Sequence, residues 1–409
     1  MDIQLLKTSK IHPKSKIEIT GSKSESNRLL LLQALYPEIQ VFNLSNSDDS
    51  VLMQKALKST DTVIDIHHAG TAMRFLTAYF STQVEREIVL TGSKRMKERP
   101  IKILVDALRE LGAEIFYLEK EGYPPLKIVG KPLSKDKVSL QANVSSQYIS
   151  ALLLIASTLK NGITLKLDGE ITSVPYIKMT LSLLNEIGIE TQFIGNTISV
   201  NPLYGKPKRK KLVVESDWSS ASYFYSVVAL SNINTEIELS SYKKNSLQGD
   251  AVLAEIYKMF GVQTTYNNDS IILKKTNQYD SENPIELDLS DAPDIAQTIV
   301  VTAFGSGRTC SLTGLHTLKI KETDRLVALK TELEKFGAEV SITENSLHLK
   351  ASNEIGENVN VATYNDHRMA MAFAPLGLKT TLTIKDAHVV SKSYPGFWED
   401  LGHIGFELK

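Results

Sequence analysis

The sequence predicts an α/β protein made of six related units that are divided between two domains. The first observation behind this prediction is a helix–glycine–strand pattern that recurs at steps of 76, 73 and 76 residues, counted at Gly112, Gly188, Gly261 and Gly337. The second is a series of apolar helix starts at steps of 44, 75, 74, 75 and 73 residues, counted at Ser26, Gly70, Ser145, Ser219, Asp294 and His367. A period of this kind indicates a repeated architecture, here with a shortened first unit.

The four glycine-containing segments share one local pattern. They read "VDALRELGAEI", "LSLLNEIGIET", "AEIYKMFGVQT" and "KTELEKFGAEV". Because glycine readily adopts the left-handed conformation that ends a helix, we expect an amphipathic helix before each glycine and a strand after it. Each unit then alternates strands with two helices, which is typical of the α/β class. The identity between units is low, so gene duplication stays a hypothesis.

Residues 319–340, "KIKETDRLVALKTELEKFGAEV", combine a helix pattern with charges on its buried side. Apolar residues recur at steps of three and four, as in the buried stripe of an amphipathic helix: Leu326, Leu329, Leu333 and Phe336. Continued toward the N-terminus, the same stripe reaches Arg325 and Glu322. Two charges on the inward face at the start of a helix require either a partner or a function.

Length and composition exclude several classes of protein. The chain has 409 residues, of which 42% are hydrophobic and 23% charged, as in a globular protein of about two large domains or several small ones. A formal net charge of −1 gives no overall field that attracts nucleic acid or an acidic membrane. The N-terminus lacks the apolar core of a signal peptide, and "ISALLLIAS" is too short to cross a bilayer. We therefore expect a cytoplasmic protein that binds neither nucleic acid nor membrane.

Cysteine and histidine usage predicts neither a disulfide nor a metal site. The single cysteine, Cys310, excludes an intrachain disulfide and fits a reducing compartment. Within "GRTCSLTG" it is expected to be a buried thiol in a strand rather than a nucleophile. His67 and His68 are adjacent, and the chain has neither an H-E-x-x-H motif nor paired C-x-x-C motifs, so we expect no zinc site.

The best internal boundary is the segment "YGKPKRKKLVVESD" at residues 204–217. Its glycine, proline and basic run are typical of a solvated linker, and they also match a nucleic-acid or nuclear-localisation patch. Because the net charge of the chain is close to zero, the linker is the favoured interpretation.

Most of the unusual chemistry lies at the helix starts. Four arginines fall in the first turn or two of a predicted helix: Arg28, Arg74, Arg325 and Arg368. A cation at that end is disfavoured by roughly 0.3–1 kcal/mol, because the helix dipole is positive there. Four such cations indicate an offsetting anion, since the guanidinium fork matches carboxylate and phosphate groups. Ion pairs within the protein are the competing explanation.

Two further helix starts carry polar residues suited to anions. Ser145, Ser146 and Gln147 open one helix, where hydroxyl and amide groups either bind a ligand or simply cap the helix. In "GSKSESNR" a loop is expected to present Lys23, but the spacing of a phosphate-binding P-loop is absent, which disfavours a nucleotide kinase. The loop "GSKRMKERP" at residues 92–100 is another basic segment, either solvated or an anion clamp.

Six segments together resemble the signature segments of the 5-enolpyruvylshikimate-3-phosphate synthase family. They are "GSKSESNRLLLLQAL", "AGTAMRFL", "RMKERP", "VSSQYISALL", "KIKETDRL" and "YNDHRMAMAF", in the family's order. The match runs from near residue 16 to "KSYPGFWEDL", so it covers essentially the whole chain. The resemblance implies a two-domain inside-out α/β barrel with three βαβαββ units per domain. It implies an N-terminal domain at residues 16–212, a C-terminal domain at residues 1–15 and 213–409, and an active site in the cleft between them.

The resemblance also implies a reaction. The enolpyruvyl group of phosphoenolpyruvate is transferred to the 5-hydroxyl of shikimate 3-phosphate by addition and elimination, and phosphate is released. This step of the shikimate pathway leads to chorismate and the aromatic amino acids, and it needs no metal or organic cofactor. It does need a base for the hydroxyl, an acid for the methylene carbon, and cations around the phosphates and carboxylates. The family further implies a monomer.

The resemblance assigns roles to matching positions. Asp294 matches the proton acceptor, and Glu322 and Lys23 match residues implicated in proton transfer. The shikimate 3-phosphate site is matched by Lys23, Ser24, Arg28, Ser145, Ser146, Gln147, Ser173, Tyr176, Asp294 and Lys321. The phosphoenolpyruvate site is matched by Lys23, Gly70, Arg95, Gln147, Arg325, Arg368 and Lys392.

Three positions depart from the family pattern, namely His68, Phe75 and Thr317, where asparagine, proline and asparagine are usual. They concern the details of the phosphoenolpyruvate pocket rather than the reaction. The alternative is the sister enzyme of the same fold that transfers enolpyruvate to UDP-N-acetylglucosamine. That enzyme carries a reactive loop cysteine in its N-terminal domain, whereas Cys310 lies in the other half of this chain. A non-catalytic anion-binding protein would need the cations but not Asp294, Lys23 and Glu322 together.

Overall fold

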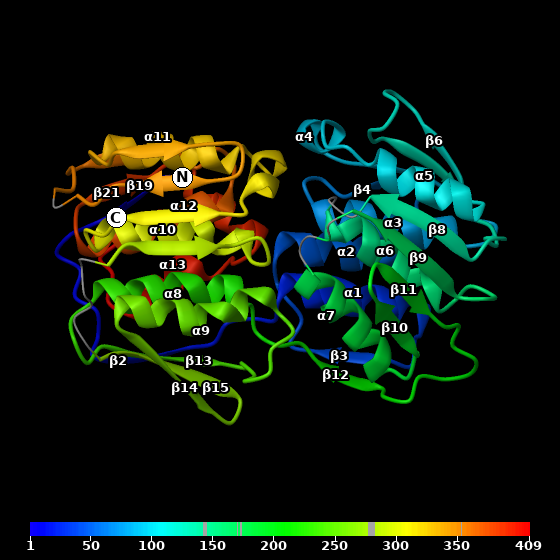
Figure 1. Ribbon diagram of the computed structural model, residues 1–409, viewed down its shortest axis with the longest axis horizontal. Coiled ribbons are helices and arrows are strands. Elements are labelled where there is room, and N and C mark those ends of the chain that lie inside the picture. The colour runs from blue at the N-terminus through cyan, green and yellow to red at the C-terminus, as the bar shows by residue number, and fades with distance from the viewer. Residues whose placement is uncertain (142–144, 170, 172–173, 277–282, 353) are drawn as a thin grey trace. The chain divides into compact units, whose positions relative to one another are not determined.

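The computed structural model describes residues 1–141, 145–169, 171, 174–276, 283–352 and 354–409 (Figure 1). Strands and helices alternate along the chain, which confirms the predicted α/β class. The chain forms two compact units: unit 1 comprises Met1–Thr20 and Glu215–Lys409, and unit 2 comprises Gly21–Val214. Within the described residues, no helix is both long enough and apolar enough to cross a membrane.

Two repeats of unit 2 show the βαβαββ order in full. The first is β4 (Val63–Asp65), α3 (Gly70–Ser81), β5 (Glu87–Thr91), the short α4 (Lys94–Lys97), α5 (Lys102–Leu111), β6 (Glu114–Tyr117) and β7 (Leu126–Val129). The second is β8 (Lys137–Gln141), α6 (Ser146–Ala156), β9 (Ile163–Asp168), α7 (Val174–Glu186), β10 (Thr191–Ile194) and β11 (Thr197–Val200). Their sheets have the same strand order, β4-β5-β7-β6 and β8-β9-β11-β10, and the first two strands are parallel in each.

The remaining repeat of unit 2 is the shortened one that the first step of 44 residues predicted. It consists of α1 (Lys23–Leu35), β3 (Gln40–Phe42), α2 (Asp48–Lys58) and β12 (Lys211–Val213). Strands β3 and β12 pair in parallel as a two-stranded sheet. The β-hairpin that ends the other two repeats of this unit has no counterpart in the described residues between α2 and β4.

Unit 1 contains two repeats of the same βαβαββ plan and a third whose sheet has three strands. Its repeats are β2 (Lys14–Ile17), α8 (Trp218–Leu230), β13 (Glu236–Ser240), α9 (Leu253–Ile256), β14 (Val262–Asn267) and β15 (Ser270–Lys275); β16 (Ile285–Asp288), α10 (Ala296–Gly305), β17 (Cys310–Thr313), α11 (Arg325–Lys335), β18 (Val340–Ile342) and β19 (Leu347–Leu349); and β20 (Val359–Val361), α12 (His367–Phe373), β21 (Leu382–Ile384), α13 (Phe397–His403) and β1 (Ile3–Leu5). Strand β1 pairs with β21, so the N-terminal strand completes the last sheet. Strand β2 pairs with β13, so all of unit 2 is inserted into one repeat of unit 1.

The glycine prediction is confirmed at all four positions. The φ angles are positive at Gly112 (109°), Gly188 (96°), Gly261 (72°) and Gly337 (91°). The helices end at or just before these glycines, and strands β6, β10, β14 and β18 follow. The expected helix before Gly261 is only partly α-helical, because α9 is a single turn between the 3-10 helices Gly249–Val252 and Tyr257–Phe260. The prediction for Cys310 is also confirmed, since its thiol is buried in β17.

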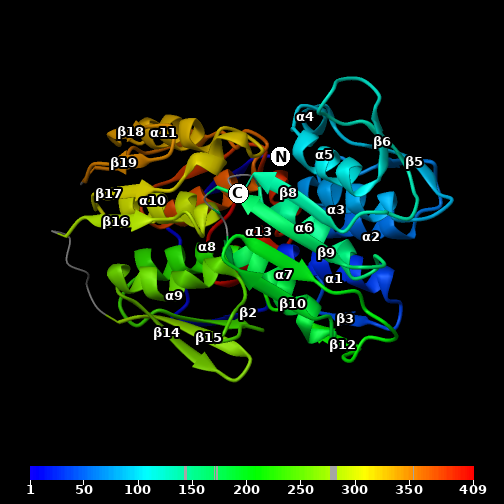
Figure 2. The same ribbon diagram turned by 45° about the vertical axis from the view of Figure 1, so that its right-hand side comes forward.

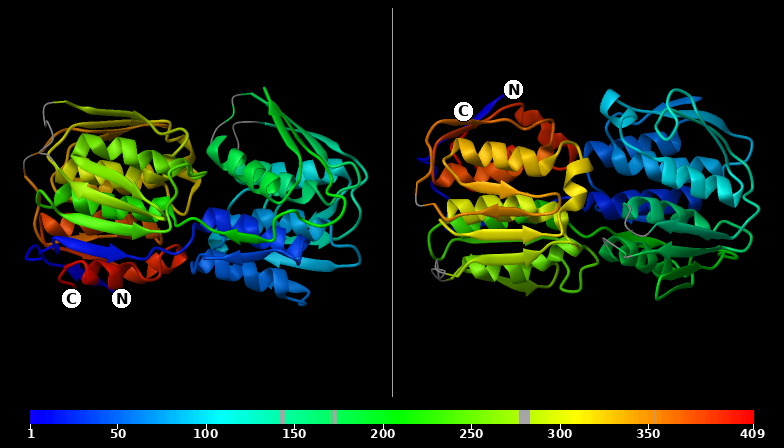
Figure 3. Two further views of the ribbon diagram at one scale, coloured as in Figure 1. Left: turned by 90° about the horizontal axis from the view of Figure 1, so that it is seen from below. Right: turned by 45° about the horizontal axis from the view of Figure 1, so that its top comes forward.

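The first helix of each repeat forms the interior. Every residue of α3, α10 and α12 is buried, and α6 and α8 each expose at most one residue partly. A helix that is buried on all sides lies in a core rather than on a surface. Figure 3 shows strands along the outer side of each unit, and Figure 2 shows β8 and β9 lying over α6.

Hydrogen bonds between central helices join residues that are one sequence repeat apart. Ser222 of α8 bonds Thr298 of α10 at 3.0 Å, and one turn later Thr302 donates to Ser226 at 2.8 Å. Both pairs are 76 residues apart, so the two helices run parallel and in register. Their N-termini therefore lie at the same end of unit 1, and a cluster of charged residues that includes Asp294 and Arg368 lies there.

Candidate active site

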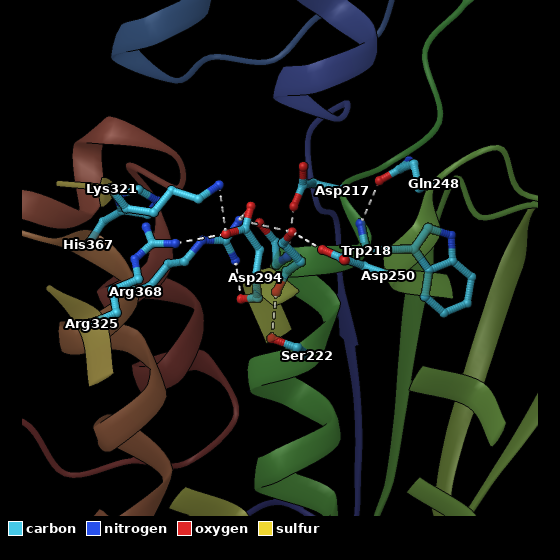
Figure 4. Close-up of polar contacts among 12 residues, drawn as sticks. Asp217, Trp218, Ser222, Gln248, Asp250, Asp294, Lys321, Arg325, His367 and Arg368 are labelled. Atoms are coloured by element: carbon cyan, nitrogen blue, oxygen red, sulfur yellow. Dashed lines mark hydrogen bonds and ion pairs between the residues drawn. The ribbon is translucent and has the colours of Figure 1, made fainter. Parts of the chain in front are cut away.

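Three helix starts and the end of one 3-10 helix in unit 1 bring charged side chains together around the carboxylate of Asp294 (Figure 4). The 3-10 turn Pro293–Ile295 leads into α10 and carries Asp294. Lys321 ends the 3-10 helix His316–Ile320, Arg325 is the first residue of α11, and Arg368 is the second residue of α12. The structure thus brings together five predicted site residues of unit 1, which are Asp294, Lys321, Glu322, Arg325 and Arg368.

Asp294 lies between three cations. Its Oδ1 is 2.8 Å from Arg325 Nη1 and 3.4 Å from Lys321 Nζ. Its Oδ2 is 3.5 Å from Arg368 Nη2, and its backbone carbonyl accepts a 2.9 Å hydrogen bond from Arg368 Nη1. The side chain of Asp294 is 17% exposed, so this carboxylate is largely but not fully removed from water.

Arg325 is neutralised by carboxylates on three sides. Besides Asp294, its Nε donates to Asp366 Oδ2 at 2.7 Å and its Nη2 donates to Glu322 Oε2 at 2.9 Å. Asp366 is fully buried and also caps α12, because its Oδ1 accepts from the Arg368 backbone N–H at 2.9 Å. Arg325 is therefore paired with carboxylates of the protein itself, which is the competing explanation given above for an arginine at a helix start.

The prediction that Glu322 belongs to the buried stripe of the helix is wrong. Helix α11 begins at Arg325, and Asp324 caps it by accepting hydrogen bonds from the backbone N–H groups of Leu326 and Val327. An aspartate one residue before a helix satisfies N–H groups that have no partner inside the helix, so it stops the helix from extending further back. Glu322 consequently lies ahead of the helix, with a side chain that is 24% exposed.

The charges of this cluster shift each other's proton affinities. Burial alone raises the pKa of Asp294, but Lys321, Arg368 and Arg325 together lower it well below the ordinary value. Burial lowers the pKa of Lys321, an effect that Asp294 partly opposes. Burial also lowers the pKa of Arg325, but Asp366, Glu322 and Asp294 more than reverse this and raise it. Asp294 is therefore an ionised carboxylate, and Arg325 is a permanent cation.

The cluster is extended by the Ser219–Asp250 pair and by the predicted residue Lys392. Arg368 Nη2 donates to Ser219 Oγ at 3.2 Å, and Ser219 Oγ in turn donates to Asp250 Oδ2. Lys392 ends the 3-10 helix Ala387–Lys392, and its ammonium group donates to the Asn365 carbonyl, just before α12. Lys392 thus lies beside the start of the helix that carries Arg368.

In unit 2, Arg28 is buried and donates to neutral acceptors. Its guanidinium donates to Thr180 Oγ1 at 2.8 Å, Ser150 Oγ at 2.9 Å, the Ser24 carbonyl at 2.7 Å and the Tyr176 carbonyl at 3.3 Å. Only 2% of Arg28 is exposed, and burial lowers its pKa to about 10. Three residues assigned to shikimate 3-phosphate, namely Ser24, Arg28 and Tyr176, are therefore joined directly.

The start of α6 lies against the start of α3. Ser145 caps α6, with its Oγ 3.4 Å from the backbone N of Gln147, so capping is a role of this serine. Gln147 Nε2 donates to Thr71 Oγ1 at 3.2 Å, and Thr71 follows Gly70 at the start of α3. These two residues are again 76 positions apart, so unit 2 joins equivalent helix positions as unit 1 does.

A residue that the sequence reasoning missed, Arg99, lies at Gly70. A Cβ atom built on Gly70 would lie 2.5 Å from Arg99 Nη1, so the guanidinium packs directly against this glycine. Arg95, the predicted residue of the same loop, pairs instead with Glu98 at 3.2 Å, and its side chain is 52% exposed. The signal was present in "RMKERP", which holds two arginines four residues apart, but the motif alone does not show which of them faces Gly70.

The other predicted positions are placed as follows. Lys23 is the first residue of α1 rather than part of a loop, because Ser22 is already the cap position. Ser146 opens α6, and Ser173 lies outside the described residues. Of the three departures, Phe75 stacks its buried ring under Arg28, with 5.4 Å between guanidinium carbon and ring centre. His68 Nε2 is 3.7 Å from Asp48 Oδ2, and Thr317 lies in the 3-10 helix before Lys321.

The arrangement suits the chemistry of anions. Unit 1 offers a carboxylate that can accept a proton and three cations that can hold phosphate or carboxylate groups. Unit 2 offers N-terminal helix ends whose backbone N–H groups favour negative charge, with Arg28, Arg99 and Lys23 beside them. Among the residues that the structure describes, no group of three or more His, Cys, Asp or Glu side chains is arranged to hold a metal ion.

Comparisons with known proteins agree on one family. The family model of EPSP synthase (3-phosphoshikimate 1-carboxyvinyltransferase) matches residues 53–401. A 3-phosphoshikimate 1-carboxyvinyltransferase of Bacteroides fragilis is 45% identical over 403 residues, which are 97% of this chain and 96% of the relative. One of Haemophilus influenzae is 38% identical over 423 aligned positions, covering 95% of this chain and 96% of the relative.

Solved structures show the same fold. The EPSP synthase of Acinetobacter baumannii superimposes with a TM-score of 0.82 at 23% identity, over 100% of this chain and 99% of that one. The enolpyruvyl transferase NikO of Streptomyces tendae superimposes with a TM-score of 0.75 at 11% identity, over 100% of this chain and 98% of that one. At these identities the likeness concerns the fold, and it confirms the predicted architecture.

Proposed function

Because the chain belongs to the EPSP synthase family, we propose that the Asp294 cluster of unit 1 and the polar helix starts of unit 2 act on one pair of substrates. The chain is an enzyme of the 3-phosphoshikimate 1-carboxyvinyltransferase type. It transfers the enolpyruvyl group of phosphoenolpyruvate to the 5-hydroxyl of shikimate 3-phosphate and releases phosphate, a step in aromatic amino-acid biosynthesis. The family model and the relatives favour this acceptor over UDP-N-acetylglucosamine.

The observation that carries the proposed site is the position of Asp294 between Lys321, Arg325 and Arg368. A carboxylate with a strongly lowered pKa is a weak base, so the substrate-free cluster is not yet set for proton transfer. Phosphate and carboxylate groups of the substrates compete with Asp294 for the same cations. When they draw these cations away, the pKa of Asp294 rises and the carboxylate becomes able to accept the proton of the 5-hydroxyl.

Protonation of the methylene carbon needs a second group. Glu322 and Lys23 are our candidates, and the exposure of Glu322 leaves its carboxyl group accessible to a substrate. Glu322 already accepts a hydrogen bond from Arg325, so its protonation is coupled to the charge state of the same cluster. We assign Glu322 and Lys23 jointly to proton transfer at carbon.

The remaining residues are proposed to bind the substrates. For shikimate 3-phosphate they are Lys23, Ser24, Arg28, Ser145, Ser146, Gln147, Ser173, Tyr176, Asp294 and Lys321. For phosphoenolpyruvate they are Lys23, Gly70, Arg95, Gln147, Arg325, Arg368 and Lys392, to which the packing of its guanidinium on Gly70 adds Arg99. We further propose that the two units are the two domains of three repeats each, and that the protein is a cytoplasmic monomer.

The test of the proposed function is release of phosphate by the purified protein. We expect release only when phosphoenolpyruvate and shikimate 3-phosphate are both supplied, and none when UDP-N-acetylglucosamine replaces the acceptor. Asp294→Asn keeps the size of the side chain and removes the base, so kcat should fall about a thousandfold. Glu322→Gln should lose activity and retain binding of shikimate 3-phosphate. A folded wild-type protein at background rate would refute the activity, and a near-normal kcat for either variant would refute its role.

A further inference from the structure

We propose that Asp250 is a positioning residue for this reaction and that it holds Arg368 through the hydroxyl group of Ser219. The proposal rests on the proposed function, in which Arg368 binds phosphoenolpyruvate. Asp250 lies in the 3-10 helix Gly249–Val252, within a segment to which the sequence reasoning assigned no chemistry. It is 3% exposed, and it is drawn close to Asp294 in Figure 4.

A short relay connects the two residues. Arg368 Nη2 donates to Ser219 Oγ at 3.2 Å, and Ser219 Oγ donates to Asp250 Oδ2. The same guanidinium is held on its other side by Asp294, through the 2.9 Å bond to the backbone carbonyl and the 3.5 Å ion pair. Arg368 is therefore held between Asp294 and the Ser219–Asp250 pair.

The position of Asp250 is fixed independently of Arg368. The segments 215–219 and 246–250 run side by side in parallel, and each bond between them joins residues 30 to 32 positions apart. Besides Ser219 to Asp250, these bonds are Ser246 Oγ to Glu215 Oε2 (2.7 Å), Gln248 Nε2 to the Ser216 carbonyl (2.9 Å) and Trp218 N to Gln248 Oε1 (3.0 Å). Because four bonds tie these two segments together, Asp250 is a rigid support for Ser219 and hence for Arg368.

Asp250 is costly as a purely structural group. Its second oxygen, Oδ1, is buried and has no hydrogen-bond partner in the part of the chain that the structure describes. A buried polar atom without a partner lowers stability, and this applies most strongly to a charged group. The carboxylate therefore contributes something other than stability, and the feature it touches is the relay to Arg368.

The intervening hydroxyl explains how Arg368 can be held and still bind a substrate. A carboxylate that paired with the guanidinium bidentately would occupy the donor fork that a substrate carboxylate or phosphate needs. Through Ser219, the carboxylate of Asp250 engages a single donor nitrogen of Arg368. Its negative charge still favours the guanidinium in that orientation.

The test compares substitutions along the relay in the full-length enzyme. In Asp250→Asn and in Ser219→Ala, the KM for phosphoenolpyruvate should rise about tenfold, because a charge-assisted relay is lost. The kcat and the Kd for shikimate 3-phosphate should stay within about twofold of wild type, since Asp294 and unit 2 are untouched. The double variant should be no worse than either single one, because both changes break the same relay. Ser219→Thr keeps the hydroxyl and should restore the wild-type KM.

The matched control is Asp288→Asn. Asp288 Oδ1 also accepts from a serine hydroxyl, that of Ser290 at 2.5 Å, but this pair is exposed and does not continue to an arginine. We expect wild-type constants for this variant, and an equal effect on KM would overturn the inference.

The outcomes separate the inference from the function on which it rests. If wild-type protein releases no phosphate with both substrates, the proposed function fails. If wild type is active and Arg368→Lys raises the KM for phosphoenolpyruvate while Asp250→Asn and Ser219→Ala do not, the relay is refuted. Equal losses in the binding of both substrates would assign Asp250 a general structural role and also refute it. Should Asp250→Asn fail to fold, the comparison of Ser219→Ala with Ser219→Thr decides.

Discussion

Arg325 in unit 1 and Arg28 in unit 2 share one sequence signal and differ in their surroundings. Each lies near the start of a helix and is 2% exposed. Arg325 donates to three carboxylates, whereas the acceptors of Arg28 are two hydroxyl groups and two backbone carbonyls. Their pKa values accordingly move in opposite directions, upward for Arg325 and down to about 10 for Arg28.

The difference shows that the charge of a buried arginine at a helix start can be stabilised in two ways. In unit 1 the protein supplies the counterions itself, so a substrate anion has to displace Asp294 or Glu322. In unit 2 the hydrogen-bond acceptors of the guanidinium are neutral and Glu25 acts on it electrostatically, so these hydrogen bonds leave much of its charge for a ligand. An incoming anion therefore meets less competition at Arg28 than at Arg325, which supports the assignment of Arg28 to shikimate 3-phosphate.

The largest effect expected from this comparison is a loss of stability in Arg325→Met. The substitution strips a cation from the fully buried Asp366 and from Asp294, and breaking a buried ion pair on one side costs about 3–5 kcal/mol. The free energy of unfolding, measured in urea, should fall by that amount. Arg28→Met is the matched variant, and an equal loss in both would contradict the distinction between the two surroundings.

A somewhat smaller effect on the free energy of unfolding is expected for Asp250→Asn, which removes a carboxylate that stability does not need. Burial raises the pKa of Asp250 to about 6, although Arg368 opposes the shift, and the ordinary value is 3.8. Between these values the folded protein binds a proton that the unfolded chain releases, so stability falls as pH rises through this window. Above it, Asp250→Asn should raise the free energy of unfolding by up to about 3 kcal/mol.

Urea unfolding of wild type and Asp250→Asn between pH 4 and pH 8 measures this effect. The gain should be complete near pH 8 and vanish as the pH approaches the ordinary value of the carboxyl group. A variant that is more stable and yet binds phosphoenolpyruvate less well would separate the role of Asp250 from fold maintenance. A difference that does not change with pH would show that Asp250 is not the titrating group.

The smallest change in stability is expected for Arg28→Met. Its lost hydrogen bonds join neutral partners, and removal of a buried charge offsets part of that loss, so the free energy of unfolding should change by about 1 kcal/mol or less. The Kd for shikimate 3-phosphate should nevertheless rise at least about tenfold. Arg74→Met serves as control, since Arg74 is likewise buried and donates to the carbonyls of Gly70 and Pro100. An equal rise in Kd for both variants would remove the special role of Arg28.

Much of the fold followed from the sequence because its signals are local and repeated. A glycine that ends a helix and an apolar stripe depend on neighbouring residues, and the four glycine segments and six helix starts reinforce one another. The start of α11 was misplaced although the aspartate of "TDR" was available as a cap signal. The apolar stripe was extended toward the N-terminus past Asp324, the residue that caps the helix.

Without the family resemblance, which supplied Asp294 and Lys321, the residues of the candidate site could be predicted only where a charge contradicts the apolar pattern. Arg325 and Arg368 stood out because cations at buried helix starts are unfavourable. Asp250 did not, because its segment has no period and its nearness to Ser219 depends on the parallel register of two distant segments. The choice between Arg95 and Arg99 likewise depends on the single turn of α4, which ends at Lys97 and directs the second arginine toward Gly70.

The insertion of unit 2 between β2 and α8 sets an order in which the molecule can be assembled during synthesis. Unit 2 is contiguous, so all of its strands and helices have been synthesised once Val214 is added. Strand β2 has to wait for β13, more than 200 residues later, and β1 has to wait for β21 near the C-terminus. Pairings between such distant segments close slowly, and waiting strands expose their edges. The nascent chain therefore carries a finished unit 2 while the first strands of unit 1 are still unpaired, and chaperones that shield strand edges would act on that stretch.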